Sequence, residues 1–232
     1  MEVTIYDELR TMKIFLDTAD TEAIKKGYET GLVDGITTNP SLIMKSHRQP
    51  EDVYHELKGM GLSDISMEVV DPNAAAMVAE GHRLAEQYGD CCTIKVPCTY
   101  DGLMACNELS KAGIRVNVTL IFNSAQAVLA AKAGAAYVSP FVGRLVDNSI
   151  HGTECVRFIA ELFKKQGVST KVLAASVRDV FSVTECFYHG ADIVTMPPAV
   201  FEKMYGHVLT DKGLQLFDDD YKQTLANLLG KQ

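Results

Sequence analysis

The stretch AGAAYVSPF (residues 133–141) returns in outline as HGADIVTMP (residues 189–197), and this echo decides the fold. Each copy has Gly-Ala at its second and third positions, then two further residues, and then Val followed by Ser or Thr. The glycine ends a helix, the β-branched run after it forms a strand, and the proline stops that strand. The stretch therefore predicts one strand–helix unit, and the same pattern occurs twice along the chain.

Short β-branched runs of the same kind occur along the whole sequence, with helical segments between them. Residues 74–88 carry apolar side chains at helical spacing, and residues 99–113 begin at Thr99, a typical N-cap, and end at Gly113. The eight predicted strands are KIFLD (13–17), GITT (35–38), ISMEV (65–69), TIKVP (93–97), VNVTL (116–120), YVSPF (137–141), KVLAAS (171–176) and DIVTM (192–196).

Eight strands that alternate with helices predict a parallel sheet, because each helix returns the chain to the same end of the sheet. Closing eight such units gives a (β/α)8 TIM barrel, which we expect to form one domain over residues 12–232. An open doubly wound sheet is the alternative, but no G-x-G-x-x-G sequence follows the first strand. We expect residues 1–11 to be an N-terminal extension outside the barrel.

Residues 211–229 predict one extra helix at the C-terminus, with an apolar stripe along it. Packing of this stripe on its own barrel is the simpler arrangement, and packing on a neighbouring subunit is the other. The stripe consists of Leu214, Leu216, Phe217, Tyr221, Leu225 and Leu228.

The composition is that of an ordinary globular chain, with 47% hydrophobic and 22% charged residues among 232. The net charge of −8 argues against nucleic-acid and anionic-membrane partners. No apolar run approaches the length of a membrane span and no signal-peptide core opens the chain, so we expect a cytoplasmic protein. The six cysteines lack zinc or C-x-x-C spacing and the histidines are scattered, so we expect reduced thiols and no metal site.

Lys95 stands inside the predicted strand TIKVP, between Ile94 and Val96. Because neighbouring strand residues face opposite ways, these two pack outward under the helices and Lys95 points into the barrel. An edge-strand lysine that blocks aggregation is the alternative, but a closed barrel has no edge. Burial disfavours the charged ammonium of a lysine, and the neutral amine can attack a carbonyl to form a Schiff base. Pro97 ends the strand, so Lys95 lies near its carboxyl end, where barrel active sites sit.

Polar side chains end several of the other predicted strands. Asp17 closes the first strand and Glu68 lies late in the third. Either one alone could be a satisfied core group, and Asp17 could instead cap the helix that follows it. Gathered around one buried lysine, however, such groups predict an acid–base site. The other members are Asn117, Thr119, Ser139 and Ser176, and Phe141 shares a strand face with Ser139.

Arg144 follows the sixth strand and Arg178 follows the seventh, so we expect both at the catalytic end of the barrel. Two arginines at the mouth of an acidic protein predict an anionic substrate group, most simply a phosphate. Ser176 and nearby helix N-terminal amides could assist them. Either arginine alone could instead be a surface residue that pairs with a carboxylate.

The motifs that carry these residues resemble the transaldolase family, and most closely its short-chain branch, which also holds fructose-6-phosphate aldolases. The resemblance runs in order from about residue 12 to the C-terminus. It rests on FLDTAD (15–20), GITTNPSLI (35–43), IKVP (94–97), NVTLIF (117–122), AGAAYVSPFVGR (133–144) and LAAS (173–176).

The resemblance implies class I aldolase chemistry on ketose phosphates, without a cofactor, because the lysine itself supplies the electron sink. Lys95 matches the Schiff-base lysine, and Asp17 matches the acid that handles protons at the substrate hydroxyls. Thr119 matches the residue that holds the catalytic water, through which Glu68 would act. The implied substrate-binding residues are Thr37, Asn39 (which would contact the dihydroxyacetone unit), Asn117, Ser139 and Phe141, with Arg144, Ser176 and Arg178 as phosphate contacts.

Two positions separate the branches of the family. This chain resembles the transaldolases in carrying Glu at position 68 and Phe at position 141, whereas the aldolases carry Gln and Tyr at the matching positions. Phe141 has no hydroxyl with which to protonate and release a bound three-carbon unit, so the enamine would wait for an aldehyde acceptor.

These residues predict a transaldolase of the pentose phosphate pathway. It would move dihydroxyacetone from sedoheptulose 7-phosphate or fructose 6-phosphate to glyceraldehyde 3-phosphate or erythrose 4-phosphate. The alternatives are a fructose-6-phosphate aldolase that releases free dihydroxyacetone and a non-catalytic barrel that binds sugar phosphates. The resemblance also implies a homo-oligomer, a pentamer or decamer in which the C-terminal helix reaches a neighbour.

Overall fold

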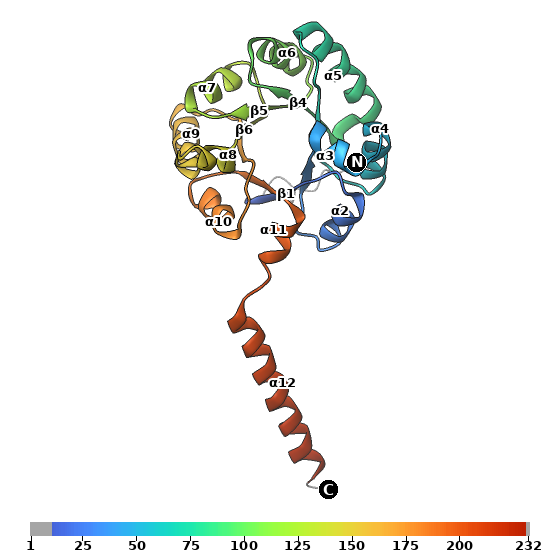
Figure 1. The fold of residues 1–232 in the computed structure, drawn as a ribbon, viewed down its shortest axis with the longest axis vertical. Coiled ribbons are helices and arrows are strands. Elements are labelled where there is room, and N and C mark those ends of the chain that lie inside the picture. Colours follow the sequence, from blue (N-terminus) through green and yellow to red (C-terminus); the bar gives the residue numbers. More distant parts are fainter. Residues whose placement is uncertain (1–10, 231–232) are drawn as a thin grey trace.

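Eight parallel strands close into a barrel in the computed structural model, which describes residues 11–230. The strands follow one another around the ring in sequence order, and β1 closes it against β8 (Figure 1). The predicted (β/α)8 barrel is therefore confirmed. All of the predicted extension except Thr11 lies outside the described residues. The strands are β1 Lys13–Asp17, β2 Gly35–Thr37, β3 Ile65–Glu68, β4 Cys92–Pro97, β5 Val116–Ile121, β6 Tyr137–Pro140, β7 Lys171–Ala174 and β8 Ile193–Met196.

Helices cover the outside of this ring, as Figure 1 shows. Their starts follow local capping chemistry: Thr99 Oγ1 accepts a hydrogen bond from Gly102 N at 3.0 Å, as its N-cap position predicts. The helices are α2 Thr21–Tyr28, α3 Pro40–Ser46, α4 Pro50–Gly59, α5 Ala74–Tyr88, α6 Tyr100–Lys111, α7 Ser124–Lys132, α8 Val142–Asp147, α9 Gly152–Gln166, α10 Val180–Tyr188, α11 Pro198–Lys203 and α12 Val208–Leu229, with a short 3-10 turn at Gly89–Cys91.

Strand alternation divides the buried side chains into two layers. Ile94 and Val96 belong to the apolar layer between strands and helices, and Lys95 between them faces the barrel interior. Part of that interior is apolar, since Phe15, Leu173 and neighbouring residues of β7 and β8 form a small cluster of their own.

Helix α12 projects away from the barrel as a single arm (Figure 1). None of its residues is buried, and its apolar stripe, including Phe217 and Tyr221, is exposed. The expectation that this stripe packs on its own barrel is therefore wrong. The reason is geometric: residues 204–207, after α11, lead the chain away from the barrel surface before α12 begins (Figure 1). Within residues 11–230, no helix is both long and apolar enough to cross a membrane.

Candidate active site

Lys95 sits on β4 with its side chain almost fully enclosed in the barrel, 5% exposed. Its Nζ donates a hydrogen bond to the Thr38 carbonyl oxygen at 2.9 Å and forms an ion pair with Glu68 Oε2 at 3.0 Å. The register pairs Glu68 with Lys95 on adjacent strands, so the ladder itself sets the two side chains next to each other. A carboxylate at this distance can take the proton that Lys95 must lose before it becomes a nucleophile.

Asp17 ends β1 and is the second carboxylate of the site. Burial raises the pKa of its carboxyl above the ordinary value, and the charge of Lys95 and a hydrogen bond from Thr37 offset only part of that rise. Thr37 Oγ1 donates to Asp17 Oδ1 at 2.8 Å and lies 2.7 Å from Thr195 Oγ1. Since Thr37 has one hydroxyl hydrogen, Thr195 is the donor in the second contact. Asp20, not Asp17, caps the following helix, so the capping alternative for Asp17 is wrong.

The floor of the site is made by neighbouring residues of β5 and β6. Ser139 Oγ donates to Asn117 Oδ1 at 2.7 Å, and Asn117 Nδ2 donates to Ser66 Oγ at 3.3 Å. Asn117 is fully buried and lies beneath the cavity, where it holds Ser139 in place. Thr119 Oγ1 is buried and has no hydrogen-bond partner within residues 11–230. A buried hydroxyl in that position is available to a water or a substrate oxygen.

Asn39 stands at the entrance, as the N-cap of α3. Its Oδ1 accepts a hydrogen bond from Leu42 N at 3.0 Å, which leaves the amide nitrogen as the group that can donate to a ligand.

The two expected arginines lie at the mouth, Arg144 on the short helix α8 and Arg178 in the loop between β7 and α10. Arg178 Nη1 donates to Asp147 Oδ1 at 2.7 Å, and the Arg144 guanidinium carbon lies 5.1 Å from the centre of the Phe141 ring. Asp147 accepts from one nitrogen of the planar Arg178 guanidinium, and within residues 11–230 no other hydrogen bond to this side chain is found, so its other N–H groups can donate to an anion. Ser176 completes this corner in a left-handed conformation with φ of +58°. Non-glycine residues in that conformation cost about 1–3 kcal/mol and cluster at functional sites.

These side chains surround one cavity of about 520 Å³ at the carboxyl ends of the strands. Its lining carries four cationic side chains against two carboxylates, a local excess of positive charge in an acidic protein. Such a lining favours an anionic ligand. The expected residues that line it are Asp17, Thr37, Asn39, Glu68, Lys95, Thr119, Ser139, Phe141, Arg144, Ser176 and Arg178.

The sequence analysis missed three polar residues of the lining, Ser41, Lys45 and Thr195. Thr195 lies in DIVTM, and the same search for polar residues within strands could have found it. The sequence around Lys45, near the end of α3, does not indicate a site residue, because its neighbours form an ordinary helix. Within residues 11–230 there is no group of three His, Cys, Asp or Glu side chains placed to hold a metal ion.

The family model described as "Transaldolase/Fructose-6-phosphate aldolase" matches residues 14–229. A relative from Roseobacter denitrificans, named "Probable transaldolase", is 49% identical over 94% of this chain and 100% of its own length. A second with the same name, from Nitrosopumilus maritimus, is 50% identical over 93% of this chain and 97% of its own. A third, from Caulobacter vibrioides, is 47% identical over 94% of this chain and 100% of its own, and has the same name.

Barrel, site and relatives together define an enzyme of the aldolase/transaldolase type. The chain belongs to the transaldolase/fructose-6-phosphate aldolase family.

Proposed function

We propose that this chain is a transaldolase that carries dihydroxyacetone on Lys95 as a Schiff base. One observation carries the proposal: the buried Lys95 amine lies 3.0 Å from Glu68 in a cavity that it shares with Asp17. A nucleophile, a proton acceptor beside it and a second carboxylate with a raised pKa are what imine formation and carbon–carbon cleavage require.

The reaction starts with transfer of a proton from Lys95 to Glu68. The neutral amine attacks C2 of the ketose phosphate, and the resulting carbinolamine loses water to form an iminium ion. Asp17 then takes the proton of the C4 hydroxyl, the C3–C4 bond breaks, and its electron pair moves into the iminium to give an enamine. An aldose phosphate leaves.

The second half reverses these steps on another aldehyde. The enamine carbon attacks the acceptor carbonyl, and Asp17 returns its proton to the new hydroxyl oxygen. Water held at Thr119 and activated by Glu68 hydrolyses the iminium and frees Lys95. The raised pKa of Asp17 suits this double duty, because a general acid–base works best with a pKa near the working pH.

The phosphate of donor and acceptor would bind at Arg144, Ser176 and Arg178, and the dihydroxyacetone unit at Asn39, Ser139 and Thr37. The local positive charge of the lining supports phosphorylated sugars such as sedoheptulose 7-phosphate, fructose 6-phosphate, glyceraldehyde 3-phosphate and erythrose 4-phosphate. These are substrates of the pentose phosphate pathway, in which we place the enzyme.

Transfer, rather than release, of dihydroxyacetone is supported by Phe141. It lines the cavity, packs edge-on against Phe122 with ring centres 5.8 Å apart, and has no hydroxyl to protonate the enamine. An assay of fructose 6-phosphate without an acceptor separates the two reactions. A transaldolase gives almost no free dihydroxyacetone, and steady release would support a fructose-6-phosphate aldolase instead.

Borohydride trapping tests the covalent step. Borohydride with fructose 6-phosphate should reduce the imine to a stable amine, and peptide mapping should place the added mass on Lys95. Lys95→Met should abolish the adduct, and Lys45→Met, which removes the other lysine in the cavity lining, should retain it. A wild-type protein that binds the sugar but gives no adduct would be a binding barrel and would overturn the proposal.

We also propose a homo-oligomer, a pentamer or decamer, in which α12 docks on a neighbouring subunit. The exposed apolar stripe of α12 supports this, because apolar patches of such length are rarely left in water. We place the protein in the cytoplasm, where its cysteines would stay reduced, and treat residues 12–232 as one functional domain.

A further inference from the structure

One cation of the active-site cavity takes no part in the proposed reaction. Lys45 lines the cavity from α3, is exposed, and among residues 11–230 its ammonium forms neither an ion pair nor a hydrogen bond. By contrast, Lys95 pairs with Glu68 at 3.0 Å. Arg178 likewise pairs with Asp147, at 2.7 Å. An ammonium that lines a cavity without a carboxylate partner can bind an anionic group of a ligand there.

Ser41 lies beside Lys45 on the same face of α3. The two residues are four apart in the helix, so their side chains are neighbours on its surface, and both line the cavity. The Ser41 hydroxyl also makes no hydrogen bond to any residue that the structure describes. A hydroxyl and an ammonium with three N–H groups are a donor set that suits a phosphate.

Opposite walls of the cavity carry these two residues and the arginines. Helix α3 follows β2, whereas α8, which carries Arg144, follows β6. In a closed ring of eight strands β2 and β6 are opposite each other, and Figure 1 shows α3 and α8 on opposite sides of the ring. Lys95 belongs to β4, midway between them. Cationic groups on two facing walls, with the buried lysine between, suit a ligand that has an anionic group at each end.

The proposed function fixes which end of the substrate lies toward α3. It places the phosphate of C6 or C7 at the arginines and joins C2 to Lys95. Asn39, the N-cap of α3, is the proposed contact of the dihydroxyacetone unit, so C1 lies on the α3 side of Lys95. A monophosphate carries only a hydroxyl at C1 and leaves Lys45 without an anion.

We propose that Ser41 and Lys45 form a second anion site, which binds a phosphate at C1 of the ligand. This inference rests on the proposed function, because that function sets the direction of the sugar chain. The class of ligand is a ketose bisphosphate, with one phosphate at C1 and the other at C6 or C7. Such a compound spans the cavity from α3 to α8 and excludes the monophosphate substrates from it.

Ligands without a carbonyl test this site apart from the Schiff base. Glucitol 6-phosphate and glucitol 1,6-bisphosphate differ only in the phosphate at C1, and neither can form an imine. In isothermal titration calorimetry, the wild type should bind the bisphosphate at least about tenfold more tightly, because hydrogen bonds between charged groups are strong. Lys45→Met should remove most of this difference by raising the dissociation constant of the bisphosphate, and Ser41→Ala should remove a smaller part. Lys45→Arg, which keeps the charge, should retain most of it.

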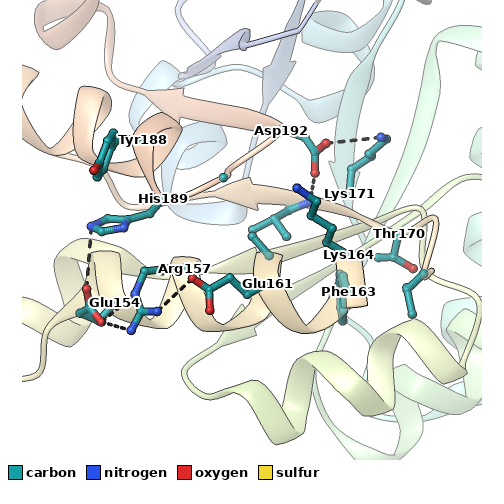
Figure 2. A pocket seen from close by; sticks show the side chains of 14 residues that line it. Glu154, Arg157, Glu161, Phe163, Lys164, Thr170, Lys171, Tyr188, His189 and Asp192 are labelled. Carbon is teal, nitrogen blue, oxygen red and sulfur yellow. Dashed lines mark hydrogen bonds and ion pairs between the residues drawn. The ribbon is translucent and has the colours of Figure 1, made fainter. Parts of the chain in front are cut away.

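Lys164→Met is the matched control. Lys164 is also an exposed lysine near the end of a helix, α9, and it forms no ion pair within the described part of the chain. It lines a separate hollow of about 960 Å³, shown in Figure 2, which shares no lining residue with the active-site cavity. Its variant removes the same charge from the protein, so the preference for the bisphosphate should persist.

Equal affinity of the wild type for the two glucitol phosphates would overturn the second anion site. An equal loss of affinity for both ligands in Lys45→Met would also overturn it, since the lysine would then only attract anions in general. Borohydride trapping of fructose 6-phosphate on Lys95 reports separately on the proposed function. Lys45-dependent binding of the bisphosphate without any trapping would refute the transaldolase and leave the anion site standing.

Discussion

Gly143, the second residue of α8, lies where that helix touches the loop after β7. Its N–H donates to the Ser176 carbonyl oxygen at 3.0 Å. A Cβ added at Gly143 would lie 2.2 Å from that oxygen, 2.9 Å from Arg178 Nε and 3.1 Å from Ser176 Oγ. Gly143→Ala therefore pushes against Ser176 and Arg178, two of the three residues proposed to bind phosphate, without touching Lys95.

The size of the effect follows from these distances. Ordinary contact begins at 3.4 Å, so the Ser176 carbonyl must retreat by 3.4 − 2.2, about 1.2 Å. A shift of that size breaks the Gly143 hydrogen bond and displaces Ser176 and Arg178 from a common anion. Losing one hydrogen bond to a charged group costs about 1.5–3 kcal/mol. We therefore expect KM for phosphorylated sugars to rise about ten- to hundred-fold. Overpacking should also lower the free energy of unfolding by about 1–3 kcal/mol.

Steady-state kinetics with two kinds of substrate check this prediction. KM for fructose 6-phosphate should rise, whereas borohydride trapping of unphosphorylated dihydroxyacetone on Lys95 should stay near the wild-type level. Gly59→Ala is the control, because a Cβ there meets nothing within 4 Å. An unchanged KM for phosphorylated sugars, or an equal loss with both kinds of substrate, would refute the proposed phosphate site.

Two further predictions concern Asp17 and α12. Burial raises the pKa of Asp17, so the folded protein keeps this proton to higher pH than the unfolded chain, and the free energy of unfolding should fall as pH rises from about 3.8 through the raised value. Urea unfolding at a series of pH values should show this fall in the wild type and its absence in Asp17→Asn; curves that stay parallel would contradict it. Truncation before α12 should leave the barrel folded by circular dichroism, because no α12 residue is buried within its own chain. Light scattering should then find an assembly of fewer subunits than in the wild type, and an assembly with an unchanged number of subunits would show that α12 is not the ring contact.

Local patterns in the sequence were enough for the barrel and for the position of Lys95. Alternation within β4 sends Ile94 and Val96 outward and Lys95 inward whatever the rest of the chain does. The eight strand–helix units need only the short-range signals of β-branched runs, caps and prolines. Such signals involve residues that are close together in the sequence, so they can be recognised without the folded structure.

Local patterns do not predict the distances between side chains on different strands, because these distances are set only when the barrel closes. Closure brings β8 beside β1, and this alone joins Thr195 to Thr37 and Asp17. The same closure puts Asn117 beneath the cavity. Asn117 and Thr119 are two residues apart and share a face of β5, but only Thr119 lines the cavity.

Packing of the helices likewise depends on surfaces that no local pattern describes. The sequence by itself predicted an amphipathic helix at the C-terminus, since spacing reveals an apolar stripe. Only the tertiary structure decided that α12 leaves its own barrel. The physical reason is that burial needs two surfaces: a sequence shows which face needs a partner, and the folded chain shows whether its own barrel supplies one.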